Sequence, residues 1–448
     1  MSTSRRIFLQ QLAAGAVAAP VLTRNALAQA QKPDRIIRHA SFGCSGMAGA
    51  DVGAIAGHPA IKVVAGCDVD SSRTEEFRKK FPEARIYKDF RELLDKEKDL
   101  HSVNVSTPDH MHAPIAMAAM QRGLHVYGQK PLTHNIYEAR RLTEKAREKK
   151  LVTQMGIQIH SSVYYRTAVA TVQAGVIGKI KEVHAWSDKK WGDNGPLPTR
   201  VDPVPPNLDW DKWLGVAAER PFISGFYHPG DWRRRLDFGT GTFGDMGCHI
   251  YDPVFKALAL TSPLSVRSEG AAPNSHSWAT DAIVNYIFPA TQYTDGPFVR
   301  VVWYDGDQKP PKEILEQARP KDAKPDDDAW RIPGQGSIFI GTKGVMVLPH
   351  VEIPRLIGEG LDKTDLVKVD GTDHWKQWVD GILGKTTPGA NFDYAGPLTE
   401  AILLGTLATR FPKTTLQWDA EKMQFPNMPE ANQYVRRQYR KGWEVEGL

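Results

Sequence analysis

The stretch Gly43-Cys44-Ser45-Gly46-Met47-Ala48-Gly49 decides the fold. It follows a short apolar run at 36–42 and precedes small residues at 50–56 that predict a helix. A second apolar run, Ile61–Cys67, then ends at Asp68. A strand, a glycine-rich turn, a helix, a second strand and an acidic residue are typical of a βαβ unit that binds a dinucleotide.

The glycines of this turn let the backbone approach a pyrophosphate, whose charge a helix N-terminus stabilises. Their spacing, G-x-x-G-x-x-G, differs from the strict G-x-G-x-x-G. Asp68 stands at the position that accepts hydrogen bonds from a ribose diol, and its charge repels the 2′-phosphate of NADP. We therefore expect NAD as the cofactor, with NADP less favoured. The expected cofactor contacts from this unit are Gly43, Ser45, Gly46, Met47 and Asp68.

Alternating helical and strand-like segments continue to about residue 156, which predicts an NAD(P)-binding Rossmann domain over 34–156. In a doubly wound sheet the loops at the carboxyl ends of the strands carry the ligand. Two such loops are expected at 107–112 and 128–131. They add the cofactor contacts Ser106, Thr107, Pro108, His112 and Lys130. Lys130 is either a solvated surface charge or a proton-transfer group whose pKa the cationic oxidised nicotinamide lowers.

The second half of the chain, 157–420, shows strand-like segments with few helices between them. This pattern predicts an α+β domain with an open, mostly antiparallel sheet, followed by a C-terminal segment at 421–448. Residues 305–328 are rich in Lys, Asp and Pro and are expected to form an exposed insertion.

Asp245 and His249 lie in the segment with the densest polar chemistry. If the segment is helical, the two side chains share one face at i and i+4. A carboxylate beside an imidazole fixes its tautomer and raises its basicity, which suits a general base for an alcohol. A structural Asp–His contact is the alternative. Pro253 is expected to break or kink the helix soon afterwards.

The first residues have the order of an export signal. Paired arginines in Ser4-Arg5-Arg6-Ile7-Phe8-Leu9 precede an apolar run at 12–22 and Ala26-Leu27-Ala28. This order predicts a twin-arginine signal peptide over 1–28 and a periplasmic or otherwise exported protein. A basic N-terminal tail is the alternative. The apolar run is too short to span a bilayer, so no membrane association is expected after cleavage.

The composition is that of an ordinary globular protein: 448 residues, 41% hydrophobic, 24% charged, with a net charge of +5. Cleavage after Ala28 removes three arginines and no acid, which lowers the charge from +5 to +2, so nucleic-acid binding is not expected. No metal site is expected, because His110, His112 and His160 lack metal-ligand spacing. The sparse, odd set of cysteines predicts buried residues and no disulfide framework: Cys44, Cys67 and Cys248.

Three patterns together resemble the Gfo/Idh/MocA family: Thr107-Pro108 with His112, Lys130-Pro131, and Asp245-x-x-x-His249. The Trp- and Pro-containing segment 186–227 resembles the branch of this family with twin-arginine signals. The resemblance implies a Rossmann domain followed by an antiparallel sheet that forms the substrate face and often a subunit interface. A homo-oligomer through that sheet is therefore expected. Gln129 departs from the glutamate that usually precedes Lys-Pro in this family.

The resemblance also implies an NAD(P)-dependent oxidoreductase that moves a hydride from a sugar, polyol or glycoside hydroxyl carbon. His249 would remove the hydroxyl proton, Asp245 would orient His249, and Lys130 would hydrogen-bond the developing carbonyl. The candidate substrate contacts are His160, Tyr164, Lys190, Trp191 and Arg233.

Export constrains the chemistry, because free NAD is scarce outside the cytoplasm. A tightly held cofactor that is regenerated in place would solve this problem. Two alternatives stay open: a glycoside-cleaving lyase or hydrolase that uses bound NAD transiently through a keto-sugar, and a catalytically silent sugar-binding protein.

Overall fold

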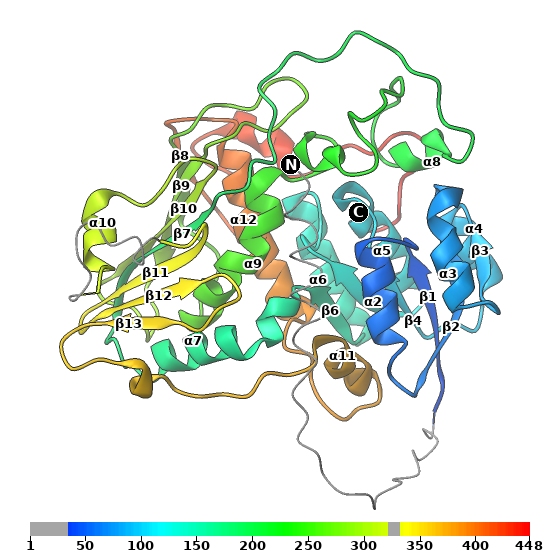
Figure 1. The fold of residues 1–448 in the computed structure, drawn as a ribbon. Helices are drawn as coiled ribbons and strands as arrows, with labels where there is room; N and C mark the ends of the chain where they lie inside the picture. Colours follow the sequence, from blue (N-terminus) through cyan, green and yellow to red (C-terminus); the bar gives the residue numbers. More distant parts are fainter. Residues whose placement is uncertain (1–34, 321–331) are drawn as a thin grey trace, which may run out of the picture. The chain divides into compact units, whose positions relative to one another are not determined.

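Six parallel strands form the first sheet of the computed structural model, which describes residues 35–320 and 332–448. The strand order is β3-β2-β1-β4-β5-β6, so the chain runs outward from β1 in both directions (Figure 1). The strands are β1 (Ile37–Phe42), β2 (Ile61–Cys67), β3 (Arg85–Tyr87), β4 (Ser102–Val105), β5 (His125–Gln129) and β6 (Thr153–Gly156). This order is that of a Rossmann domain, and it confirms the fold class expected for the first half.

Helices connect these strands and bury their apolar faces on the sheet. Every residue of β4 is buried, as expected of a central parallel strand. α5 packs against α6 as well as against β4 and β5. The connecting helices are α2 (Met47–Ile55), α3 (Glu75–Lys80), α4 (Phe90–Lys96), α5 (His112–Gln121) and α6 (Ile136–Lys149).

The second sheet has eight strands in the order β13-β12-β11-β7-β10-β9-β8-β14. Only β10 and β7 pair in parallel within it, and the other neighbours are antiparallel. This confirms the mostly antiparallel second sheet. Its strands are β7 (Ile180–Ser187), β8 (Ser265–Ser268), β9 (Ile283–Pro289), β10 (Phe298–Asp305), β11 (Gln335–Gly341), β12 (Val345–Pro349), β13 (Arg355–Ile357) and β14 (Thr415–Gln417).

α9 (Gly241–Ala257) packs on β7 and β11 and carries the Asp245 and His249 side chains. Pro253 was expected to break or kink this helix, and the break is wrong, since α9 continues to Ala257. The missing N–H of one proline is tolerated because the flanking turns are buried against α7 (Val163–Gln173) and α12 (Phe392–Ala408).

The expected exposed insertion is also wrong over part of its length. α10 (Lys312–Gln317) turns Ile314 onto an apolar cluster that includes Trp186 and Tyr304 of the second sheet. Figure 1 shows α10 on the side of this sheet away from α9 and α12. This amphipathic helix was not predicted, because the composition of the surrounding segment is polar.

Two late helices return to the first sheet. α11 (His374–Ile382) packs on α2, and α12 packs on α6 and β6. All described residues from Arg35 to Leu448 cluster into one unit, so the domain boundaries expected from the sequence stay predictions. Across this unit, the helices are each too short or too polar to cross a membrane. The export signal lies outside the described residues.

Candidate functional site

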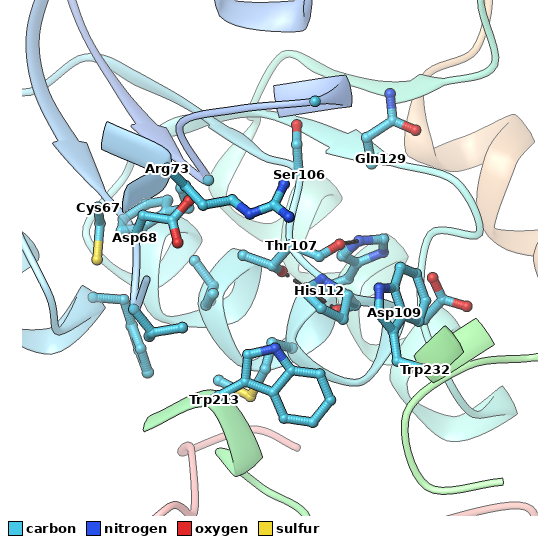
Figure 2. A pocket seen from close by; sticks show the side chains of 18 of the residues that line it. Cys67, Asp68, Arg73, Ser106, Thr107, Asp109, His112, Gln129, Trp213 and Trp232 are labelled. Carbon is cyan, nitrogen blue, oxygen red and sulfur yellow. Dashed lines mark hydrogen bonds between the residues drawn. The ribbon is translucent and has the colours of Figure 1, made fainter. Parts of the chain in front are cut away.

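A pocket of about 310 Å³ opens at the carboxyl edge of the first sheet. Its size lies in the range that small-molecule sites occupy. All ten residues that the sequence predicts as cofactor contacts line it, together with Arg233 and Asp245. Figure 2 labels Asp68, Ser106, Thr107 and His112 among them. The ten come from the loops after β1, β2, β4 and β5, because parallel strands bring their carboxyl ends to one edge.

The turn after β1 leaves room for a ligand. Gly43 has φ +94°, and a Cβ there would lie 2.8 Å from both the Cβ of Ala48 and the carbonyl oxygen of Ser106. Gly46 has φ +59°, but a Cβ there would meet no atom within 4 Å. α2 starts directly after Gly46 without a side-chain cap, so its first N–H groups are available to an anion. These features fit the pyrophosphate of a dinucleotide.

Asp68 ends β2 at the same edge. Its carboxylate accepts hydrogen bonds from the backbone N–H of Cys44 at 3.0 Å and of Asp70 at 3.0 Å, one on each oxygen. Burial raises the pKa of Asp68, and these two donors oppose the shift. The remaining lone pairs can accept from a ribose diol. Arg73 lines the pocket as well and donates to the hydroxyl of Ser45 at 3.2 Å.

His112 fastens the two ligand loops to each other. Its Nε2 lies 2.7 Å from the carbonyl oxygen of Thr107 and its Nδ1 2.7 Å from that of Pro131. Burial lowers the pKa of His112 to about 4. A neutral imidazole donates from one nitrogen only, so one of these contacts is a hydrogen bond from the ring and the other an electrostatic contact.

Lys130 points at α9. Its Nζ lies 2.6 Å from Oδ1 and 3.0 Å from the backbone oxygen of Asp245. Arg233 approaches the same carboxylate at 3.4 Å. Burial by itself raises the pKa of Asp245, but the nearby Lys130 and Arg233 overcome this and hold it well below its usual range. The carboxylate is therefore ionised and fixes the position of the ammonium group.

Asp109 adds a second carboxyl to this cluster. Burial raises its pKa to about 7, although Arg233 and Lys130 favour the ionised form. Its Oδ2 accepts a hydrogen bond from the hydroxyl of Thr240 at 2.9 Å. Asp109 was not predicted as a site residue, although it lies in the loop at 107–112, in which Thr107, Pro108 and His112 were predicted as cofactor contacts.

Gln129 occupies the position where the resemblance leads one to expect a glutamate. Its amide donates to the buried Asp51 carboxylate at 2.9 Å, and Ser106 and Trp375 donate to the same carboxylate at 2.9 and 3.1 Å. Burial raises the pKa of Asp51 to about 6. A glutamate at 129 would face this carboxyl, so the amide avoids placing two acids in one buried site.

His249 lies one helical turn beyond Asp245 and does not line the pocket. Among the described residues, the ion pairs of Asp245 go to Lys130 and Arg233, and none goes to His249. The His249 ring lies 5.8 Å from that of His350, whose Nδ1 is 2.7 Å from the hydroxyl of Tyr165. Burial, followed by the charge of Lys130, lowers the pKa of His249, so the imidazole is neutral.

The five predicted substrate residues are dispersed. Arg233 lines the pocket, and its guanidinium lies 5.7 Å from the Trp191 ring. His160 is held by Asp252 on α9, at 2.9 Å, whereas Lys190 pairs with Asp307. Tyr164 is exposed at the start of α7.

One wall of the pocket is formed by residues that were not predicted from the sequence. Trp213, His228, Trp232 and Trp443 line it from segments far along the chain. Figure 2 shows Trp213 and Trp232 across the pocket from Arg73 and Ser106. These residues belong to no motif, and only the tryptophan content of the segment around 186–227 could have suggested a binding role.

Two family models match the chain. The model described as "Oxidoreductase family, NAD-binding Rossmann fold" matches residues 37–157, and the one described as "Oxidoreductase family, C-terminal alpha/beta domain" matches residues 171–319. Both models belong to one family, and together they include the loops after β1, β4 and β5 and all of α9.

Two curated relatives are sugar or polyol dehydrogenases by name. Levoglucosan dehydrogenase of Pseudarthrobacter phenanthrenivorans is 24% identical over 43% of this chain and 41% of its own length. The scyllo-inositol 2-dehydrogenase (NADP(+)) of Bacillus subtilis is 23% identical over 58% of this chain and 65% of its own length. The chain thus matches less than two thirds of the length of either relative.

Solved structures share the fold over nearly their whole length. The WlbA dehydrogenase of Bordetella pertussis, solved with NADH and UDP-GlcNAcA, gives a TM-score of 0.61 at 15% identity, covering 86% of this chain and 99% of its own. Aldose-aldose oxidoreductase of Caulobacter crescentus, solved with glycerol, gives 0.56 at 13% identity, covering 86% and 100%.

Proposed function

Since this chain belongs to the Gfo/Idh/MocA oxidoreductase family, we propose that it is an NAD-dependent oxidoreductase acting on a hydroxyl of a sugar, polyol or glycoside. The observation that carries the proposal is the placement of Lys130. Its ammonium is fixed by Asp245 inside the same pocket that all ten predicted cofactor contacts line.

NAD in this pocket supplies a hydride acceptor next to the loop that carries Lys130. The Lys130 ammonium donates a hydrogen bond to the substrate oxygen and stabilises the negative charge that develops on it. The ionised Asp245, which also pairs with Arg233, holds the ammonium in place. This differs from the arrangement expected from the sequence, in which Asp245 orients His249.

His249 is the candidate base. Its neutral imidazole can accept the hydroxyl proton, and Nδ1 has no hydrogen-bond partner within the described part of the chain. His350 and Tyr165 extend the polar surface beyond it. The substrate would then lie between Lys130 and this surface, on the α9 side of the pocket.

The proposal also covers the choice of cofactor, the cellular location and the oligomeric state. Asp68 favours NAD over NADP, because its carboxylate occupies the ribose end of the pocket. The arginine pair at 5–6 supports export by the twin-arginine route into the periplasm, with cleavage after Ala28. The second sheet supports a homo-oligomer, in line with the family resemblance.

A panel of sugars, polyols and glycosides tests the activity. Each compound is mixed with the NAD-loaded protein, and reduced nicotinamide is followed by absorbance. We expect reduction with at least one compound, and loss of that signal in Lys130→Met, which keeps the length of the side chain without its charge. Failure of every compound, or equal reduction by Lys130→Met, would contradict the proposal.

One observation also supports redox-assisted glycoside cleavage as a second candidate. The pocket is covered by residues from 212 to 233 and by Trp443, which suits a cofactor that stays bound through a full redox cycle. In that case a glycoside substrate would lose its aglycone without net accumulation of NADH. Chromatography of the products alongside the absorbance assay separates the two reactions.

A further inference from the structure

Residues 207–233 cover the pocket, and we call this segment the roof. It includes α8 (Trp210–Leu214) and runs beside the edge of the first sheet (Figure 1). Its residues that line the pocket are Lys212, Trp213, His228, Pro229, Trp232 and Arg233.

The roof has an apolar core of its own. Trp210 stacks on Trp213 with ring centroids 4.9 Å apart and 15° between the planes. Phe222 and Tyr227 of the roof, with Phe238 just beyond it, close the cluster around them. A segment that packs on itself in this way moves as a unit, so its docking contacts decide whether the whole roof is in place.

One set of docking contacts converges on Asp70, two residues beyond Asp68. Asn207 donates from Nδ2 to Oδ1 of Asp70 at 2.6 Å, and His228 Nε2 lies 2.8 Å from Oδ2. The backbone reinforces the junction: Ser71 N–H donates to the Asn207 carbonyl at 2.9 Å, and Asp209 N–H donates to that of Val69 at 2.9 Å. Asp70 is buried, whereas Asn207 and His228 are partly exposed, so these contacts are partly shielded from water.

A second set of contacts lies at the other end of α8. The Trp213 carbonyl oxygen is 3.1 Å from His110 Nε2, on the loop after β4. The C-terminal segment closes over it, since Arg440 donates to the Gly215 carbonyl at 3.0 Å and Trp443 lines the pocket. The roof is therefore attached to the loops after β2 and β4, on both sides of the proposed cofactor.

We propose that the roof is the second wall of the dinucleotide site, and that Asn207 acts as a positioning residue that holds it closed on Asp70 between turnovers. The roof reaches both ends of the pocket, with Lys212 beside Asp89 near the ribose end and Arg233 on Asp245 near Lys130. A dinucleotide lying between Asp68 and Lys130 could leave only after the roof undocks. This inference rests on the proposed function.

The rate of NAD release tests the proposal. Protein purified with bound NAD is mixed with an excess of isotopically labelled NAD, and the nucleotide that stays with the protein is followed by mass. Asn207 does not line the pocket, so Asn207→Ala changes only the docking. We expect release to become about tenfold faster, as for loss of one hydrogen bond to a charged group. Asn194→Ala is the matched control. Asn194 lies outside the roof and donates a hydrogen bond to the hydroxyl of Thr280, so this variant should keep the wild-type rate.

A double-mutant cycle identifies the partner. Because Asn207 acts through Asp70, adding Asn207→Ala to Asp70→Ala should produce no further acceleration. If Asp70→Ala does not fold, the single variant Asn207→Asp is measured in place of the cycle, since two facing carboxylates should also speed release. Wild-type release from Asn207→Ala, or a full additional effect in the double variant, would overturn the role of the roof while leaving the cofactor site intact. A wild-type protein that binds no NAD would overturn the proposed function itself.

Discussion

Two cations and two carboxyls meet where the loops after β4 and β5 face α9. Lys130 and Arg233 share Asp245, while Asp109 stands beside them with a pKa of about 7. Charges buried this closely hold one another in place, and removing one leaves its partner unpaired. The cluster therefore positions Lys130 with little freedom, as transition-state stabilisation requires.

Lys130→Met should lower turnover by about 10²- to 10³-fold, the range for loss of one preorganised hydrogen-bond donor to a developing oxyanion. NAD content should stay at the wild-type level, because the backbone of the loop after β5 is unchanged. Single-turnover reduction of bound NAD measures the first quantity, and nucleotide extraction measures the second. Near-wild-type turnover would remove Lys130 from the mechanism.

Asp109→Asn should change how stability depends on pH. The folded state raises this pKa from 3.8 to about 7, so it binds a proton that the unfolded chain has released over this range. Stability from this group is therefore complete below about pH 4 and is lost as the pH rises through about 7, at no more than about 1.4 kcal/mol per pH unit.

Urea unfolding of the nucleotide-free protein between pH 5 and 8 measures this effect. The wild type should lose stability relative to Asp109→Asn as the pH rises. A difference between the two proteins that is constant with pH, or that changes in the opposite direction, would show that the folded state does not raise the pKa of Asp109.

At the scale of elements, the turn between β1 and α2 combines two different uses of glycine. Gly43 has no room for a Cβ because Ala48 and Ser106 lie too close, whereas Gly46 faces open space. The open side at Gly46 is the side on which α2 begins. The first glycine thus serves packing within the protein, and the second leaves space for the ligand.

Gly46→Ala and Gly123→Ala form a matched pair, since both glycines have positive φ and neither has an atom within 4 Å of an added Cβ. Each substitution should cost about 1–3 kcal/mol of stability, because a positive φ is strained for a residue that carries a Cβ. Only Gly46→Ala should weaken NAD binding, measured by calorimetry, because Gly123 lies outside the pocket. Equal NAD affinities for the two variants would contradict the placement of the pyrophosphate.

Elements with a strong local pattern were predictable from the sequence. The bounds of β2 match those of the expected run Ile61–Cys67, because it is a short apolar run between clear breaks. The continuation of α9 past Pro253 and the burial of α10 were not, because both depend on tertiary packing that overrides local preference.

The residues of the candidate site also fall into those that were predictable from the sequence and those that were not. Residues that follow parallel strands were predictable, since topology alone brings those loops to one edge. Trp213, His228 and Trp443 were not, because contacts between distant segments place them. The partner of Asp245 was also misassigned: sequence spacing favoured His249, whereas folding brings Lys130 to within 2.6 Å. The prediction that all three cysteines are buried and free is confirmed.

At the scale of the whole molecule, the two sheets support different parts of the candidate site. The first sheet presents the loops that hold the cofactor, and the second supports α9, which supplies Asp245 and His249. The roof then covers the pocket between them. The proposed export would suit this arrangement, because a retained cofactor does not depend on free NAD outside the cytoplasm.

Export makes a prediction of its own. Protein recovered from the periplasm of an expressing bacterium should begin at Gln29 by N-terminal sequencing, since the signal is expected to be removed after Ala28. Replacing Arg5 and Arg6 by lysine should block its appearance there, because the twin-arginine receptor reads that pair. An intact Met1 on periplasmic protein, or unaffected export of the lysine variant, would contradict the signal assignment.

The central claim is that this pocket holds NAD, and the nucleotide content of the purified protein tests it most directly. Protein purified without added nucleotide is denatured, and the released cofactor is identified by its mass and spectrum. We expect the released cofactor to be NAD, at close to one molecule per chain. A protein that carries no nucleotide and binds none when NAD is added would contradict it.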